Sequence, residues 1–283
     1  MKPPVSRAAF ASVLIGPRTL GASLVAARCA SSSAAAAVTA YDHASFVKEI
    51  AATDPPEHLN SLLNVLQARG EKIVSPGAKR GLIPCVVPLS ESPAGDLTSL
   101  LRWPTAPTGM EMPVVEVRKH GLWFLAKNVK QYIHRILVEA DLTGDDLWAA
   151  VGEAGKNLYA KGEFKESQVA DLDVYLLKKV GLFPDVIERK TLRHLEKGDN
   201  EAAELAGWED EQLEFIREKV TEEGKREDLK RGKAPEQVIL DEAAFLMDLA
   251  SVDGNWDEVV DRIAECYREA GLHDIANFIA YRE

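Results

Sequence analysis

Residues 113–126 read Pro-Val-Val-Glu-Val-Arg-Lys-His-Gly-Leu-Trp-Phe-Leu-Ala, and this stretch decides the fold of the first half of the chain. Up to Arg118, apolar and charged side chains alternate with the period of two that is typical of a strand with one buried face. A Lys-His-Gly turn follows at 119–121, and then an apolar run. The pattern predicts a β-hairpin between 113–118 and 122–126.

Two more strand signals precede the hairpin. The segments 82–89 and 96–103 are rich in apolar and β-favouring residues and are joined by short polar loops. Pro84 and Pro88 cannot donate main-chain hydrogen bonds, so the first segment is predicted to be an edge strand or a bulged one. Together with the hairpin, these segments predict a small antiparallel meander.

Two helices are predicted before the meander. The first spans 42–52 and has Asp42 as its N-cap, because a carboxylate oxygen can accept from the free N–H groups of the first turn. The second spans 57–69, where leucines recur at helical spacing, and Gly70 follows as the residue that ends it.

Everything after Lys127 has helical periodicity. The predicted helices include one single, heavily charged segment over 208–230 and an apolar stripe over 169–180. The remaining helical segments are 129–137, a segment from Gly144 to Leu158, one or two helices over 185–206 interrupted near Gly198, and 241–252, 256–270 and 273–281. The predicted fold class is therefore α+β, predominantly α-helical, with a small antiparallel β meander followed by an all-α region.

The same signals predict the domain organisation. Residues 1–41 form an organellar transit peptide, 42–142 a small α+β domain and 143–283 an all-α region. A charged hinge is expected near 221–235, where Gly232 and Pro235 interrupt the helical pattern.

The transit peptide is predicted from composition. Residues 1–41 contain no acidic side chain, and the basic ones lie among Ala, Ser, Leu and Val. This is typical of an organellar targeting segment. We expect the mitochondrial matrix as the first choice and the plastid as the second.

Charge excludes some partners. The 283 residues carry 34 Lys and Arg against 45 Asp and Glu, a net charge of −11. A phosphate backbone needs a cationic surface, so nucleic acid is not expected as a partner. No apolar run is long enough to span a bilayer. The expected partners are other protein subunits of a mitochondrial complex.

Nucleotide and metal motifs are missing from the sequence. Residues 151–157 resemble a phosphate-binding loop but lack its first glycine and its final Ser or Thr, so a helix end is preferred there. Asp248, Asp253, Asn255 and Asp257 are acidic enough for calcium, but their spacing favours a turn before a helix.

Nucleophilic chemistry has one weak candidate. Cys85 with His120 or His134 could form a thiol–imidazole pair, but Cys85 lies in an apolar run, which favours an inert buried thiol. The other cysteine of the mature chain, Cys266, is also expected to be a buried thiol.

Paired carboxylates and tryptophans have structural explanations. Asp145 with Asp146, and Asp171 with Asp173, lie at expected helix starts and are interpreted as caps. The tryptophans at 103, 123, 148, 208 and 256 are interpreted as core or interface anchors. We predict no catalytic, cofactor-binding or metal-binding residue and no cofactor.

A partial resemblance adds a specific function. Three short motifs follow in order within residues 75–119: Ser75-Pro76-Gly77, then Pro88-Leu89-Ser90-Glu91-Ser92, then Gly109-Met110-Glu111-Met112-Pro113-Val114-Val115-Glu116-Val117-Arg118-Lys119. They resemble the N-terminal half of an accessory subunit in the mitochondrial ATP synthase of chlorophycean green algae. The resemblance implies a non-catalytic subunit of the peripheral stalk or dimer scaffold, and it carries over no functional residue.

The sequence therefore predicts a non-catalytic accessory or scaffold subunit of a mitochondrial membrane complex. Two alternatives stay open: an organellar interaction or assembly factor outside ATP synthase, and an enzyme with a dispersed site. On the scaffold reading, Glu111, Glu116 and Arg118 should be replaceable by alanine without loss of any chemistry.

Overall fold

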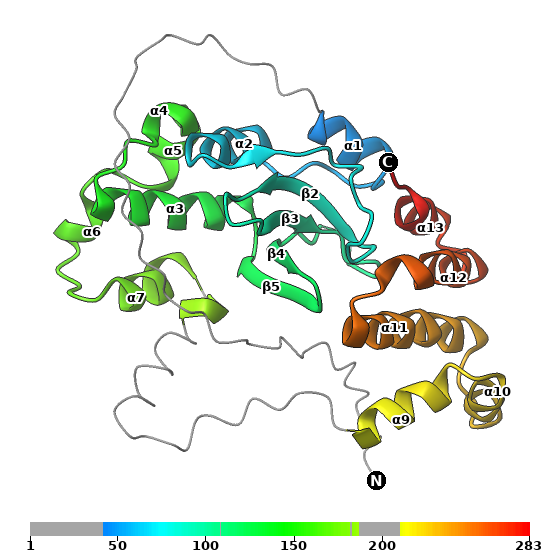
Figure 1. The fold of residues 1–283 in the computed structure, drawn as a ribbon. Coiled ribbons are helices and arrows are strands. Elements are labelled where there is room, and N and C mark those ends of the chain that lie inside the picture. Colours follow the sequence, from blue (N-terminus) through cyan, green and yellow to red (C-terminus); the bar gives the residue numbers. More distant parts are fainter. Residues whose placement is uncertain (1–41, 108, 182, 187–209) are drawn as a thin grey trace.

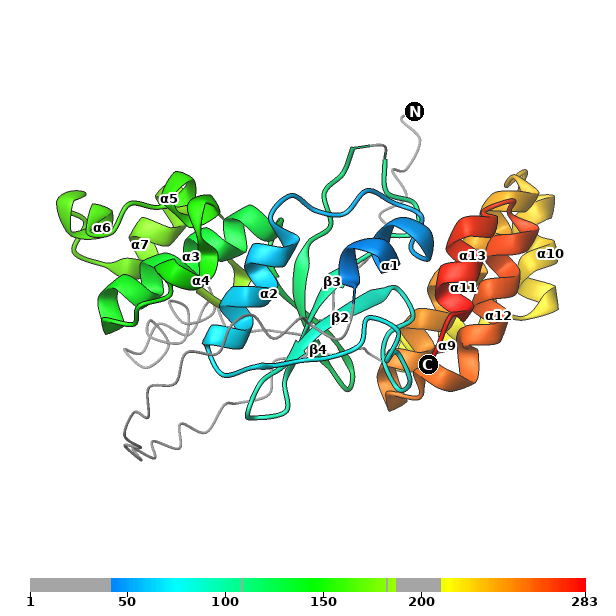
Figure 2. The ribbon, with the colours of Figure 1, turned by 90° about the horizontal axis from the view of Figure 1, so that it is seen from above.

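The computed structural model describes residues 42–283 except 108, 182 and 187–209. Figures 1 and 2 show the elements in three groups arranged in a row. A central sheet is covered by α1 and α2, a group of short helices lies on one side, and a helical bundle lies on the other. The transit peptide predicted over 1–41 lies outside the described residues, and the predicted domain division remains a prediction.

The sheet is an antiparallel meander in the order β1-β2-β3-β4-β5, so each strand pairs with its neighbours in sequence. The fold class predicted above is confirmed. The predicted hairpin is β4 paired with β5, with Val117 opposite Leu122 and Arg118 opposite Gly121. The strand bounds are Lys72–Ile73, Val86–Glu91, Leu97–Leu101, Val114–Arg118 and Gly121–Ala126.

The second strand is bulged, one of the two outcomes that its prolines predicted. Pairing between β2 and β3 shifts between Pro88 and Ser90. On the other side, β1 pairs only with Ser90 and Glu91. Pro88 thus lies where no N–H is needed on that side.

Before the sheet, the start of the first helix and the end of the second are marked by the residues predicted for them, whereas the second helix begins at Leu59 without a side-chain cap. In α1 (His43–Glu49), the Asp42 side chain accepts from the Ser45 N–H at 3.0 Å. The next helix, α2 (Leu59–Ala68), buries its leucines and is followed by Gly70 with φ +85°, a conformation that glycine adopts without strain.

The group of short helices begins with α3 (Val129–Thr143), which carries the predicted apolar stripe. The stripe predicted over 169–180 is not one regular α-helix. It forms one turn of α-helix, α7 (Leu172–Tyr175), and continues as a π-turn over Leu176–Val180 that Gly181 ends. The other elements of this group are α4 (Trp148–Val151), α5 (Glu153–Leu158) and α6 (Glu163–Glu166).

The bundle contains α9 (Asp210–Lys219), α10 (Glu222–Lys230), α11 (Pro235–Asp253), α12 (Trp256–Glu269) and α13 (His273–Ala280). The single helix predicted over 208–230 is wrong in its described part, because the chain breaks between α9 and α10. Thr221 is extended there, and its hydroxyl accepts from the Gly224 N–H at 3.1 Å. A threonine at the N-cap position favours the start of a new helix over the continuation of the preceding one.

The bundle contacts the sheet at the tip of the β4–β5 hairpin. The Trp256 indole N–H donates to the main-chain oxygen of Lys119 at 3.0 Å, and His120 Nδ1 lies 3.1 Å from the oxygen of Ser251. Gly254 lets the two turns approach, because a Cβ there would lie 2.8 Å from the Lys119 oxygen. The hairpin tip therefore fits the corner between α11 and α12.

The end of the chain makes a second joint with the sheet domain. Lys79 is fully buried, and its ammonium donates to the Phe278 carbonyl near the end of α13. The Tyr281 ring packs edge-on against Phe46, and Glu283 contacts Ser75. No helix among the described residues is long and apolar enough to cross a membrane.

Candidate functional site

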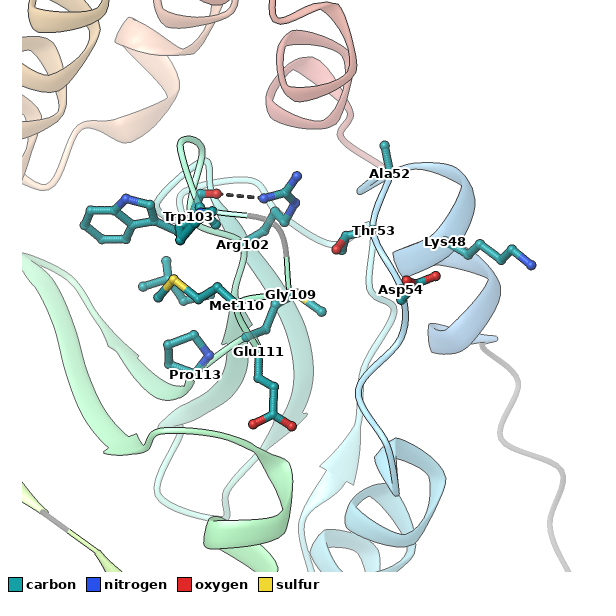
Figure 3. Close-up of a pocket in the computed structure, with 14 residues that line it drawn as sticks. Lys48, Ala52, Thr53, Asp54, Arg102, Trp103, Gly109, Met110, Glu111 and Pro113 are labelled. Atoms are coloured by element: carbon teal, nitrogen blue, oxygen red, sulfur yellow. Dashed lines mark hydrogen bonds between the residues drawn. The ribbon is translucent and has the colours of Figure 1, made fainter.

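A pocket of about 540 Å³ lies between the end of α1 and the loop that joins β3 to β4. Figure 3 shows Thr53 and Asp54 on one side of this pocket and Trp103, Met110 and Glu111 on the other. The volume lies within the range of small binding sites. We call this site the α1–β3 pocket and define it by its lining residues: Lys48, Ala52, Thr53, Asp54, Leu101, Arg102, Trp103, Ala106, Pro107, Gly109, Met110, Glu111, Met112 and Pro113.

The α1 side of the pocket is a fixed turn. The chain leaves the helix through Ala52, whose φ of +49° is unusual for a residue with a side chain. The Thr53 N–H donates to the Val47 oxygen at 3.2 Å and fastens the turn to the helix. Strained residues of this kind persist where the surroundings hold them, and they often occur at functional sites.

Arg102 is the charged group inside the pocket. Its Nε donates to the Ala51 oxygen at 3.2 Å and its Nη1 to the Trp103 oxygen at 2.7 Å. Burial lowers the pKa of the guanidinium, and the Asp274 carboxylate opposes that shift from beyond ion-pair distance. The group stays charged, because arginine remains protonated in proteins.

The rest of the lining combines buried apolar side chains with charged ones at the rim, and most of the surface that it exposes is polar. Met112 and Pro113 are buried, while 47% of Met110 is exposed. At the rim, Glu111 accepts from the Asn128 side chain at 2.5 Å, and Lys48 and Asp54 are exposed. The pocket can therefore hold an apolar group close to a charged one.

The candidate nucleophile does not meet its candidate bases. Cys85 is buried next to Lys79, and burial raises the pKa of its thiol to about 11. His120 contacts Ser251 in the bundle joint, and the His134 ring packs against Tyr159. Within the described ranges, no contact joins Cys85 to either histidine, and a protonated buried thiol is a poor nucleophile.

The acidic positions have structural contacts. Asp171 caps α7 by accepting from Asp173 N–H at 2.8 Å, as predicted. Asp145 accepts from the Thr143 hydroxyl at 2.6 Å instead of capping a helix, because α4 begins after Leu147 and has no side-chain cap. Asp257 accepts from the Gly81 N–H at 2.9 Å. In the part of the chain that the structure describes, no three His, Cys, Asp or Glu side chains are placed to hold a metal ion.

The phosphate-loop look-alike is a break between two helices. Residue Val151 ends α4, Gly152 has φ +64°, and α5 follows at once. No strand precedes it, so its main-chain N–H groups form no phosphate cradle after a strand. The prediction of no catalytic, cofactor-binding or metal-binding residue stays a prediction.

The tryptophans that the structure describes lie in different places. Trp256 is buried where the hairpin tip meets the bundle. The Arg118 guanidinium carbon lies 4.8 Å from the centroid of the Trp123 ring, and the Lys161 ammonium lies 5.0 Å from the centroid of the Trp148 ring. Trp103 lines the α1–β3 pocket, and Trp208 lies outside the described residues. They form no row on which bases could stack.

Sequence reasoning missed both Arg102 and Lys79. Arg102 lies near the end of the strand segment predicted over 96–103 and belongs to no motif, because the pocket joins it to residues about 50 positions earlier. Lys79 gave no signal, because its partner Phe278 lies 199 residues away. The surroundings of both cations can be recognised only in the folded structure.

Two family models match the chain. The one described as PAB N-terminal matches residues 41–179, which contain the sheet, the α1–β3 pocket and nearly all of the short-helix group. The one described as PAB C-terminal domain matches residues 213–281, which form most of the bundle.

One relative is similar over most of its length. It is named "Protein IN CHLOROPLAST ATPASE BIOGENESIS, chloroplastic", from Arabidopsis thaliana. The two proteins are 50% identical over 301 aligned positions, which cover 85% of this chain and 91% of the relative. No solved structure matches this chain.

The resemblance to a mitochondrial ATP synthase accessory subunit is therefore wrong, and so is the stalk or dimer-scaffold role that it implied. That resemblance depended on turn and strand motifs within 75–119, which set the geometry of a meander and identify no partner. The similarity over 301 positions outweighs it. With its two matched models and a relative of this identity, the chain belongs to the PAB family.

Proposed function

We propose that this chain is an assembly factor in the biogenesis of the chloroplast ATPase. The observation that carries the proposal is the 50% identity to the Arabidopsis relative named for that process, over 91% of its length. On this proposal the protein acts in the plastid, binds protein subunits during assembly, and is not a subunit of the finished enzyme.

The chain's own features support a binding role. Several described titratable groups have structural roles. Asp171 caps α7, Arg135 pairs with Asp185, and Cys85 is buried. The α1–β3 pocket offers an apolar and a charged group together. The acid-free composition of residues 1–41 fits import into an organelle.

The test is complementation of an Arabidopsis line that lacks the relative. We expect the full chain to restore the amount of assembled chloroplast ATPase, measured by native gel electrophoresis with quantitative mass spectrometry. An unchanged ATPase deficit in a line that expresses the protein in plastids would overturn the proposal.

The same gels separate a factor from a subunit. A factor should be much less abundant than the ATPase and should migrate with partly assembled subunits. Migration with the complete enzyme at equal stoichiometry would contradict the assembly role.

A further inference from the structure

Arg102 differs from the other partly or fully buried arginines that the structure describes. Arg118, Arg135, Arg262 and Arg282 each contact a carboxylate within ion-pair distance. Arg102 has no such partner among the described residues and is held by two main-chain oxygens instead. Its charge is therefore held in place by main-chain oxygens, and the Asp274 carboxylate acts on it only from outside ion-pair distance.

For binding a ligand, the half-buried charge of Arg102 matters more than the exposed charges at the rim of the pocket. Lys48, Asp54 and Glu111 are exposed, and exposed charges are screened and contribute little to binding. Arg102 is half-buried, so a carboxylate that reaches it meets a less screened cation. Two of its five N–H groups are used by the main chain, which leaves donors for a ligand.

The apolar part of the pocket lies beside this cation. Met110 is one of the few large apolar side chains that are nearly half exposed, and Trp103 lines the same pocket. Methionine is flexible and polarizable, which suits a surface that accepts different apolar side chains. Figure 3 shows Arg102 between Trp103 and Thr53, with the Trp103 indole extending away from Thr53.

We propose that the α1–β3 pocket binds an acidic segment of a partner protein, with an Asp or Glu carboxylate on Arg102 and an adjacent apolar side chain on Met110 and Trp103. The choice of a partner segment rests on the proposed assembly function. The choice of an acidic one rests on charge complementarity to a guanidinium that forms no ion pair with any described residue.

The test uses the full chain and an array of overlapping peptides from the chloroplast ATPase subunits. Each peptide with an acidic residue next to an apolar one has a matched copy with Asn or Gln in place of the acid. We expect the wild-type protein to bind some of the acidic peptides about tenfold or more tightly than their amide copies. Arg102→Gln should remove that difference, and Arg80→Gln, at an exposed arginine, should keep it.

A second variant protects the test if Arg102→Gln fails to fold. Met110→Glu changes an exposed side chain and brings a negative charge into the pocket, so it should also abolish binding of the acidic peptides. Leu229→Glu, at a residue 44% exposed in the bundle, is its control. Equal binding of acidic and amide peptides, binding that survives both pocket variants, or no binding at all would overturn the inference.

The outcomes separate this inference from the proposed function. The array also carries acidic peptides from unrelated proteins. Arg102-dependent binding of those peptides alone would support the pocket and count against the ATPase. Full complementation by the Arg102→Gln chain would leave the assembly function intact and overturn the pocket as its docking site.

Discussion

The Lys79 ammonium lies 2.6 Å from the main-chain oxygen of Phe278 and 3.7 Å from the centroid of the Phe278 ring. The oxygen belongs to the last turn of α13, whose carbonyls have no partner within the helix. The Lys79 side chain thus gives one carbonyl at the end of α13 a hydrogen-bond donor. It also joins this helix to the segment between β1 and β2.

This joint predicts a dependence of stability on pH. Burial lowers the pKa of Lys79 from 10.5 to about 7, so between these values the unfolded chain binds more protons than the folded one. The free energy of unfolding should therefore rise with pH from 7 to 9.5, by at most about 1.4 kcal/mol per pH unit from this group. Urea unfolding at several pH values measures the rise.

Lys79→Met is the matched variant for this measurement. It keeps a side chain of similar length without a titratable group, so the rise should be smaller in the variant than in the wild type. Identical pH profiles of the two proteins would contradict the depressed pKa.

The contact between Gly254 and Lys119 predicts a costly glycine substitution. Gly254→Ala puts a Cβ 2.8 Å from the Lys119 oxygen at φ +71°, whereas Gly232→Ala meets a similar φ of +89° with nothing within 4 Å. We expect Gly254→Ala to destabilise the protein by about 2 kcal/mol more than Gly232→Ala, because only the first adds a clash. Equal midpoints in urea would show that the hairpin tip can move away.

The buried carboxylate of Glu242 predicts a large effect in the bundle. Its two oxygens accept from Arg262 at 2.8 and 2.9 Å, and Oε2 also accepts from Lys225 at 3.1 Å. Glu242→Gln leaves two cations without their shared anion and should cost about 2 to 3 kcal/mol. Glu227→Gln, which removes an exposed pair with Arg231, should cost less than about 0.5 kcal/mol. Thermal unfolding of both variants makes the comparison.

The last two residues predict a local effect. Arg282 contacts Asp257, and the Glu283 N–H donates to the Gly77 oxygen at 3.0 Å. Removal of both residues should speed amide hydrogen exchange in α13 and around Gly77 while exchange in α3 stays unchanged. A uniform acceleration in all three places would mean that the whole protein had lost stability instead.

The local parts of the fold could be predicted from the sequence because their causes are local. The alternation up to Arg118 and the turn after it specify the hairpin, and Asp42 and Gly70 mark helix ends by their own chemistry. The break at Thr221 was missed because a charged run looks helical on both sides of a cap.

The candidate site could not be predicted in the same way. Arg102 becomes distinctive only because no carboxylate in the described part of the chain lies within ion-pair distance of it, and Ala52 only because its φ is positive. Neither property is visible in residue type or spacing. Long-range packing decides both, and a single sequence contains no direct record of that packing.

The contacts of Lys79 and Glu283 also have a consequence for how the chain folds. The meander pairs only strands adjacent in sequence, so it needs no distant part of the chain in order to form. By contrast, Lys79 reaches its partner across 199 residues, and Ser75 meets Glu283 across 208. A chain that emerges from a ribosome or an import channel with its N-terminus first can build the sheet early. The contacts of Ser75 and Lys79 with residues 278–283 can form only after that later part of the chain has arrived.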